Sequence, residues 1–226
     1  MIQAVVFDLD NTLWDFMKAK RVAVEAAVEA MIDAGMDLGK EAMINRIFNL
    51  YSVEGIEDQQ IFDKILLQEF GKIDYKILAA GIIGYRRAKE GALTLYPHVM
   101  STLIGIAKRG IKMAVISDAP RLAVWMRLCS FNLHPIFDQV ITFDDTGERK
   151  PSPKPFRKLL ELWPLDPQHV VMVGDWAERD VVGAKQVGMK TVFARYGNLF
   201  ETKESGADYE INDIKEIISI IEKENG

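Results

Sequence analysis

The stretch AVVFDLDNTL, from Ala4 to Leu13, decides the fold of this chain. Its apolar first half is typical of a strand that is covered on both faces, as in a parallel sheet. Asp8 and Asp10 follow that half, and open parallel sheets bind their ligands just beyond the carboxyl ends of the strands. Because side chains two residues apart in an extended chain point the same way, we expect the two carboxylates to face one small volume.

Two carboxylates that share a small volume are costly unless their charge is compensated. Like charges about 4–6 Å apart raise one pKa or attract a cation, and Mg²⁺ prefers oxygen ligands from carboxylates, water and phosphate. Asp8 and Asp10 therefore indicate a shared proton or a metal ion. From this pair alone, two aspartates that cap turns at a strand end are an equally good interpretation.

The composition limits the class of protein. The chain has 226 residues, 49% of them hydrophobic, and a formal net charge of −5, which suits one large domain or a core domain with an insertion. An acidic balance without a basic stripe argues against nucleic-acid binding. No apolar run reaches the about 20 residues of a membrane span, so we expect a cytoplasmic protein with no membrane partner. The single Cys129 excludes an internal disulfide and is expected to be buried.

The periodicity of apolar residues changes twice along the chain. Four amphipathic helices are expected after the first strand, at about 18–36, 40–51, 58–70 and 75–89, and four consecutive helices predict a small bundle. From Leu95 on, expected strands at 112–118, 139–143, 169–175 and 190–194 alternate with helices, which predicts a parallel sheet. The predicted domains are an α/β core, at 1–14 and 94–226, and a helical insertion, at 15–93.

Polar residues stand where the expected strands end. Ser117 and Asp118 close the second strand, and Asp175 closes the fourth, with Asp180 five residues on. A loop expected over 144–151, with Lys150 near its end, follows the third strand. Because the carboxyl ends of parallel strands meet at one edge of a sheet, these side chains are expected to converge with Asp8 and Asp10.

The ordered set of these motifs resembles that of the haloacid dehalogenase-like (HAD) hydrolase superfamily. The resemblance rests on Asp8-Leu9-Asp10-Asn11-Thr12, the strand ending at Ser117, Lys150-Pro151, and Gly174-Asp175 with Asp180. It implies a three-layer Rossmann-like α/β core in which the helical insertion takes the place of that superfamily's helical (C1) cap. The implied activity is that of a Mg²⁺-dependent phosphatase, which acts on a small phosphorylated metabolite through an aspartyl-phosphate.

The resemblance also implies residue roles. Asp8 would attack the phosphorus, and Asp10 would act as general acid and then as general base. Mg²⁺ would be held by Asp8, the backbone carbonyl of Asp10, and Asp175. Ser117 and Lys150 would bind the phosphoryl group, while Asp180 would hold the metal shell or Lys150 in place. The remaining substrate-binding candidates are Leu9, Asn11, Thr12 and Asp118.

Several alternatives stay open. From the residues alone, Ser117 and Asp180 are also plausible caps, and a solvated lysine is the usual case for a charged loop such as that of Lys150. A phosphosugar mutase of the same superfamily would use the same residues, and a regulatory module without turnover would keep the same fold. Side chains just after the catalytic loop would face the leaving group or, as the favoured alternative, serve packing: Trp14, Phe16, Lys18 and Arg21. A monomer and a homodimer are equally compatible with the sequence.

Overall fold

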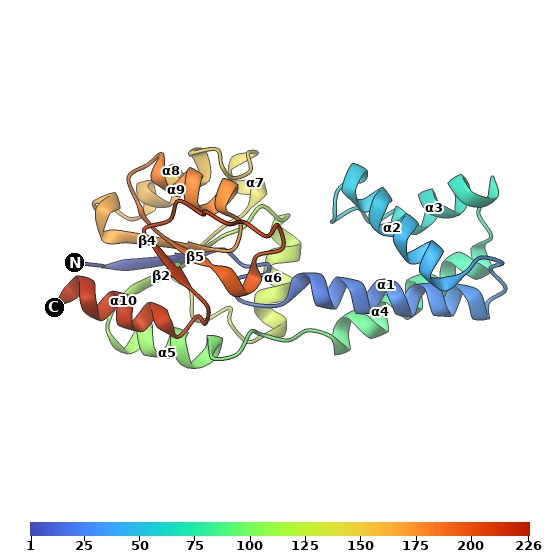
Figure 1. Ribbon diagram of the computed structural model, residues 1–226, viewed down its shortest axis with the longest axis horizontal. Coiled ribbons are helices and arrows are strands. Elements are labelled where there is room, and N and C mark those ends of the chain that lie inside the picture. Colours follow the sequence, from blue (N-terminus) through green and yellow to red (C-terminus); the bar gives the residue numbers. More distant parts are fainter. The chain divides into compact units, whose positions relative to one another are not determined.

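The computed structural model describes all 226 residues, which divide into two compact units. One unit is made of Met1–Asp15 and Thr94–Gly226, and the other is Phe16–Leu93. The first unit holds every strand of the chain, and the second holds the first four helices (Figure 1). No helix has the length and apolar composition that crossing a bilayer requires.

Six parallel strands form a single sheet in the order β3-β2-β1-β4-β5-β6. The strands are β1 (Ala4–Phe7), β2 (Lys112–Ile116), β3 (Gln139–Ile141), β4 (Val170–Gly174), β5 (Lys190–Ala194) and β6 (Tyr209–Ile211). Strand β1 lies in the middle, where Val6 pairs with Ala114 of β2 and Met172 of β4. All four of its residues are buried, as expected of a strand covered on both faces.

Helices cover both faces of the sheet. The helices α5 (Val99–Lys108) and α10 (Glu216–Asn225) lie on one face, and α8 (Lys154–Leu162) and α9 (Val182–Lys185) lie on the other (Figure 1). The remaining elements of this unit are α6 (Arg121–Ser130), α7 (Phe143–Thr146), η1 (Pro167–His169), η2 (Ala177–Val181) and η3 (Arg195–Gly197). Phe156 and Leu159 of α8 pack against Val6 and Met172 of the sheet. The predicted α/β fold class, with a parallel sheet between helical layers, is confirmed.

The helical unit contains α1 (Phe16–Asp33), α2 (Lys40–Glu54), α3 (Ile61–Phe70) and α4 (Tyr75–Gly91). Its core is built from Met and aromatic side chains among aliphatic ones, including Met31, Met43 and Phe62. Helices α1 and α4 approach closely at Gly84, where an added Cβ would lie 2.7 Å from the carbonyl oxygen of Ala26.

A buried lysine lies inside this bundle. The Lys20 ammonium is 4.1 Å from the centroid of the Tyr51 ring and 5.4 Å from that of Tyr85, within the range of a cation–π interaction. These contacts give the buried charge favourable partners within its own unit.

Three local predictions from the sequence are wrong. The strand at 190–194 is not the last, because the three-residue β6 adds an edge strand that is too short to show a period. Helix α7 replaces the start of the expected loop at 144–151, and the Asp145 carboxylate accepts a hydrogen bond from the Thr142 backbone N–H at its beginning, 2.8 Å away. Cys129 is exposed, because it lies on the solvent side of α6.

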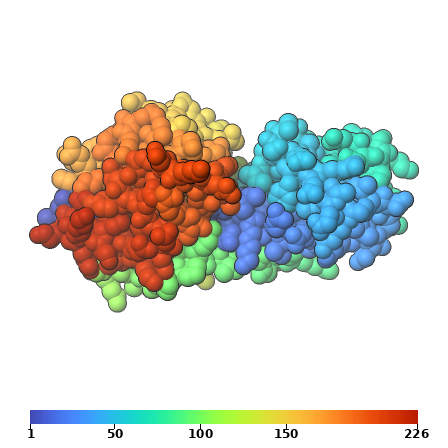
Figure 2. All heavy atoms as spheres, in the orientation of Figure 1, coloured from blue at the N-terminus to red at the C-terminus, as the bar shows by residue number.

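The first unit also holds the segments that lead to and from the helical unit. Trp14 and Leu95 form an antiparallel bridge, and the backbone N–H of Tyr96 donates to the carbonyl of Leu13 (3.0 Å). The chain ends meet on the same unit, where Asn225 Nδ2 donates to the Ile2 carbonyl (3.1 Å). Figure 2 shows the dark-blue N-terminal residues beside the red C-terminal ones.

Candidate active site

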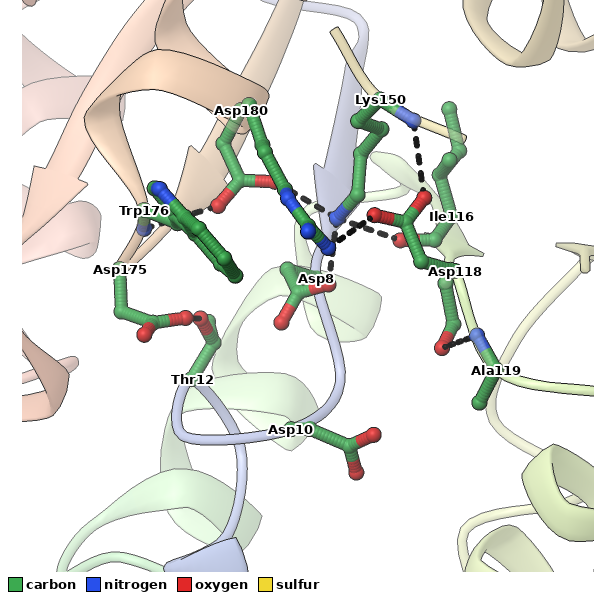
Figure 3. A network of polar contacts seen from close by, with 12 residues as sticks. Asp8, Asp10, Thr12, Ile116, Asp118, Ala119, Lys150, Asp175, Trp176 and Asp180 are labelled. Atoms are coloured by element: carbon green, nitrogen blue, oxygen red, sulfur yellow. Dashed lines mark hydrogen bonds and ion pairs between the residues drawn. The ribbon is translucent and has the colours of Figure 1, made fainter. Parts of the chain in front are cut away.

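The carboxyl ends of β1, β2 and β4 bring most of the predicted site residues together (Figure 3). Asp8 follows β1, Ser117 follows β2 and Asp175 follows β4, while Lys150 enters from the loop that precedes α8. These four side chains and that of Asp180 are all buried. The loops thus form a polar, charged cluster at one edge of an otherwise apolar sheet.

The ammonium group of Lys150 lies at the centre of this cluster. Its Nζ is 2.5 Å from Asp8 Oδ1 and 2.6 Å from Asp180 Oδ1, and it also donates to the carbonyl of Ile116 (3.2 Å). Burial would lower the pKa of Lys150, but the carboxylates of Asp180, Asp8 and Asp118 outweigh that effect and raise its pKa. Lys150 is therefore a permanent positive charge between two acidic side chains.

The two aspartates at the ends of β1 and β4 are harder to ionise than exposed carboxyls, although Lys150 is close by. Burial raises the pKa of Asp8 to about 7, with Lys150 opposing the shift and Asp180 and Asp10 adding to it. Burial also raises the pKa of Asp175, and the charges of Asp8 and Asp180 raise it further. Buried carboxylate oxygens with excess negative charge are the donors that a hard divalent cation takes, so the residues present fit Mg²⁺.

The carboxylate of Asp10 points away from Asp8 and Asp175 (Figure 3). Its Oδ1 accepts a hydrogen bond from Trp14 Nε1 (2.7 Å), and its Oδ2 pairs with Arg127 Nη1 (2.8 Å). The prediction that the side chains of Asp8 and Asp10 face one small volume is therefore wrong. Strand β1 ends at Phe7, before either aspartate, so the extended geometry on which that prediction depended does not continue.

The loop after Asp8 is a tight turn between β1 and the rest of the unit. Leu9 is buried and its carbonyl accepts a hydrogen bond from the Leu13 N–H (3.0 Å), while Asn11 has a φ of 62°. This left-handed region is uncommon for residues other than Gly, and Asn is one of the side chains that tolerate it. The Thr12 hydroxyl donates to Asp175 Oδ1 (3.0 Å), which joins the turn to the end of β4.

Residues of η3 contact this turn, and no motif in the sequence pointed to them. The hydroxyl of Tyr196 donates to the carbonyl of Thr12 (2.8 Å). A Cβ on Gly197 would lie 1.8 Å from the carbonyl oxygen of Asn11 and 2.9 Å from Cβ of Asp175. Glycine is required there by close backbone approach, and a single Gly carries no signal of such a contact in the sequence.

The two residues that follow β2 have different neighbours. Ser117 Oγ accepts a hydrogen bond from the Ala119 N–H (3.2 Å), which is the turn-capping arrangement that the sequence left open. Asp118 Oδ1 accepts from the backbone N–H of Lys150 (2.9 Å), and its Oδ2 pairs with Arg179 Nη1 (3.0 Å). Both carboxylate oxygens of Asp118 therefore bind neighbouring loops of the protein.

Two arginines that belong to none of the sequence motifs also lie in this region. The side chain of Arg127 is only 6% exposed, and it shares the buried face of α6 with Val124 and Leu128. Arg127 is three residues after Val124 and one before Leu128, which puts it on the apolar face of the helix. The sequence pattern therefore indicated a buried arginine. Arg179 lies directly before Asp180, and its guanidinium is 3.6 Å from the ring centroid of Trp176.

The four candidates for facing the leaving group divide between the two units. Trp14 is buried in the α/β unit, and its indole N–H donates a hydrogen bond to the Asp10 carboxylate. This position agrees with the packing alternative. The other three belong to α1 of the helical unit, where Phe16 is buried and Lys18 is exposed. The Arg21 guanidinium lies 5.6 Å from the Phe48 ring of the same unit. Contact of these side chains with a substrate stays a prediction.

Comparison with known proteins gives matches along the whole chain. A family model of haloacid dehalogenase-like hydrolases matches residues 2–188. The glyceraldehyde 3-phosphate phosphatase of Pyrococcus furiosus is 34% identical over 100% of this chain and 95% of its own. A HAD phosphatase structure from Thermococcus onnurineus covers 97% of this chain and 98% of its own, at 27% identity and a TM-score of 0.70. A structure from Thermotoga maritima that is provisionally named a β-phosphoglucomutase covers 98% and 99%, at 23% identity and a TM-score of 0.76.

Proposed function

The chain belongs to the haloacid dehalogenase-like hydrolase family, and we propose that it is a Mg²⁺-dependent phosphatase of a small phosphorylated metabolite. The observation that carries this proposal is the position of the Lys150 ammonium, 2.5 Å from Asp8 and 2.6 Å from Asp180 at the edge of the sheet. A buried cation beside a buried carboxylate suits a nucleophile that must meet an anionic phosphate.

In the first step an oxygen of Asp8 attacks phosphorus, the bond from phosphorus to the ester oxygen breaks, and Asp10 gives a proton to the leaving oxygen. In the second step Asp10 takes a proton from water, the water oxygen attacks phosphorus, and the bond between phosphorus and Asp8 breaks. For this role the Asp10 carboxylate has to turn from Trp14 and Arg127 toward the ester. Lys150 stays charged throughout and offsets the negative charge on Asp8 and on the phosphoryl oxygens.

Mg²⁺ would be held by the carboxylates of Asp8 and Asp175 and the backbone carbonyl of Asp10. It would supply the positive charge that lets a phosphate dianion approach the Asp8 carboxylate. Thr12 would keep the Asp175 carboxylate in place through the hydrogen bond from its hydroxyl. The Ser117 hydroxyl would donate a hydrogen bond to a phosphoryl oxygen, while its Oγ still accepts one from the Ala119 N–H.

The helical unit Phe16–Leu93 would act as the cap that selects the leaving group. We propose glyceraldehyde 3-phosphate as the first substrate to test, because the Pyrococcus furiosus relative is named for it. The comparisons do not favour the mutase alternative, since the structure with a mutase name is similar at only 23% identity and supports the fold alone. Action in the cytoplasm stays a prediction.

The test measures phosphate release from an aryl phosphate and from glyceraldehyde 3-phosphate, with Mg²⁺ and with a chelator. We expect phosphate to be released in the presence of Mg²⁺ but not with the chelator. The variant Asp8→Asn should release none. Asp33→Asn changes an exposed aspartate of the helical unit and should release phosphate at the rate of the unmodified protein. Absence of Mg²⁺-dependent release from a broad panel of phosphate monoesters would refute the proposal.

A further inference from the structure

We propose that Arg179 is a positioning residue for Lys150: it closes a ring of contacts that fixes both the backbone and the ammonium group of that lysine. The inference rests on the proposed function, in which Lys150 offsets the charge of Asp8 and the phosphoryl group. It concerns Arg179, to which the motifs give no role, and it also gives a role to Trp176 beside Asp175.

The first half of the ring holds the backbone of Lys150. The Lys150 N–H donates to Asp118 Oδ1 (2.9 Å), and the other oxygen of Asp118 pairs with Arg179 Nη1 (3.0 Å). The Asp118 side chain is mostly buried, so its charge needs a partner. Arg179 supplies that partner and thereby ties the loop after β2 to the segment after β4.

The second half of the ring holds the ammonium group. Lys150 Nζ pairs with Asp180 Oδ1 (2.6 Å), and Asp180 Oδ2 accepts a hydrogen bond from the Trp176 N–H (3.0 Å). The indole of Trp176 has its centroid 3.6 Å from the Arg179 guanidinium, and this contact completes the ring of interactions. The Asp180 carboxylate packs closely against the backbone of Gly174, where an added Cβ would lie 2.2 Å from its Oδ2.

Arginine is suited to this position because it makes two kinds of contact at once. The edge of its planar guanidinium binds a carboxylate while its face covers an aromatic ring, and the ammonium group of lysine cannot do both. Trp176 itself stacks on Phe200, with ring centroids 4.3 Å apart. The stack therefore supports the ring against which the Arg179 guanidinium lies. A small displacement of Lys150 is enough to weaken catalysis.

The experiment compares Arg179→Met and Arg179→Lys in the full chain with the unmodified protein. The matched control is Arg121→Met, because Arg121 also pairs with a carboxylate of the same unit, Asp145 (2.6 Å), but outside the site. Three phosphate esters are assayed: glyceraldehyde 3-phosphate, phosphoglycolate, which has a second anionic group, and an aryl phosphate. Inhibition by orthovanadate and the thermal midpoint are measured for every variant.

We expect kcat/KM of Arg179→Met to fall about tenfold for all three esters, since Lys150 acts on the phosphoryl group that they share. The vanadate inhibition constant should rise by a similar factor, and Arg179→Lys should recover little. In a Lys150→Met background the Arg179→Met substitution should cost nothing further, because the two act as one unit. Arg121→Met should leave kcat/KM and vanadate inhibition unchanged.

Three results would overturn the inference. A loss confined to phosphoglycolate would show that Arg179 contacts the substrate itself. A lower thermal midpoint with unchanged vanadate inhibition would show a structural role only, and full additivity with Lys150→Met would show independent action. Failure of the proposed function is distinct from all of these, because the unmodified protein would then hydrolyse none of the esters with Mg²⁺.

Discussion

At the scale of single residues, the turn after β1 depends on the backbone conformation of one residue. Asn11 has a φ of 62°, a region that costs an ordinary L-residue roughly 1–2 kcal/mol. Glycine would adopt it without that cost. Asn is among the few other residues that tolerate this backbone conformation.

Asn11→Val should destabilise the protein by about 1–2 kcal/mol and lower phosphate release, because a β-branched residue does not accept this φ. Asn11→Gly should retain activity within about threefold. The free energy of unfolding in urea and the rate of phosphate release check both. Asn45→Val, on the exposed side of α2, is the control and should change neither. Equal effects of Val and Gly at position 11 would contradict the explanation.

The ion pair of Asp10 and Arg127 gives a second prediction for single residues. The side chains are 21% and 6% exposed, so loss of one partner leaves a charge that water reaches poorly. Asp10→Ala should cost about 3 kcal/mol of unfolding free energy, at the low end for a buried pair because Asp10 is partly exposed. Adding Arg127→Met should recover part of that loss.

Urea denaturation of the two single variants and the double variant measures this coupling. Glu29→Ala removes the partner of Lys40 in an exposed pair at 2.6 Å and should leave the urea midpoint unchanged. An unchanged urea midpoint in Asp10→Ala would show that the stability of the protein with Arg127 buried does not depend on its pairing with Asp10.

At the scale of elements, η3 and the turn after β1 approach closely because Gly197 has no side chain. The Cβ of alanine at position 197 would meet the carbonyl oxygen of Asn11 at 1.8 Å, and a backbone carbonyl cannot move aside as a flexible side chain can. Gly197→Ala should therefore displace the turn, with a loss of about 1–3 kcal/mol in stability and at least about tenfold in phosphate release.

Thermal unfolding and the phosphate assay test this together. Gly91→Ala is the matched control, because a Cβ there meets nothing within 4 Å and alanine favours the end of α4. It should leave activity unchanged and stability equal or higher. Normal activity of Gly197→Ala would show that the turn tolerates displacement.

Elements with a strong local pattern were predictable from the sequence, and elements defined by distant partners were not. Continuous apolar runs identified β1, β2, β4 and β5, and the polar residues that follow three of these strands identified most of the site. Strand β6 is defined by its pairing with β5. A three-residue segment is too short for its sequence to indicate such a pairing. The direction of the Asp10 side chain likewise depends on Arg127, which is distant in the sequence. Asp118 and Arg179 meet only because two strands end at the same edge of the sheet.

At the scale of the whole molecule, the acidic cluster links stability to pH and to metal. Burial raises the folded-state pKa of Asp8 from 3.8 to about 7 and raises that of Asp175. The folded protein then binds protons more tightly than the unfolded chain, so without metal these groups lower the unfolding free energy as pH rises between about 4 and 7. A divalent cation competes with those protons.

Mg²⁺ should therefore raise the thermal midpoint more at pH 8 than at pH 5, because at pH 5 it has to displace bound protons. Thermal unfolding with Mg²⁺ and with a chelator at both pH values measures the difference. Asp175→Asn should abolish most of the Mg²⁺ effect, and Asp33→Asn should preserve it. A Mg²⁺ shift of equal size at both pH values would argue against a metal bound by these carboxylates.

The central place of β1 has a consequence for how a ribosome delivers this protein. Strand β1 is translated before the helical unit, yet its neighbours β2 and β4 come only after that unit. During synthesis β1 therefore has no strand to pair with while α1 to α4 emerge. The nascent chain consequently exposes an unpaired, aggregation-prone apolar segment until β2 has been made.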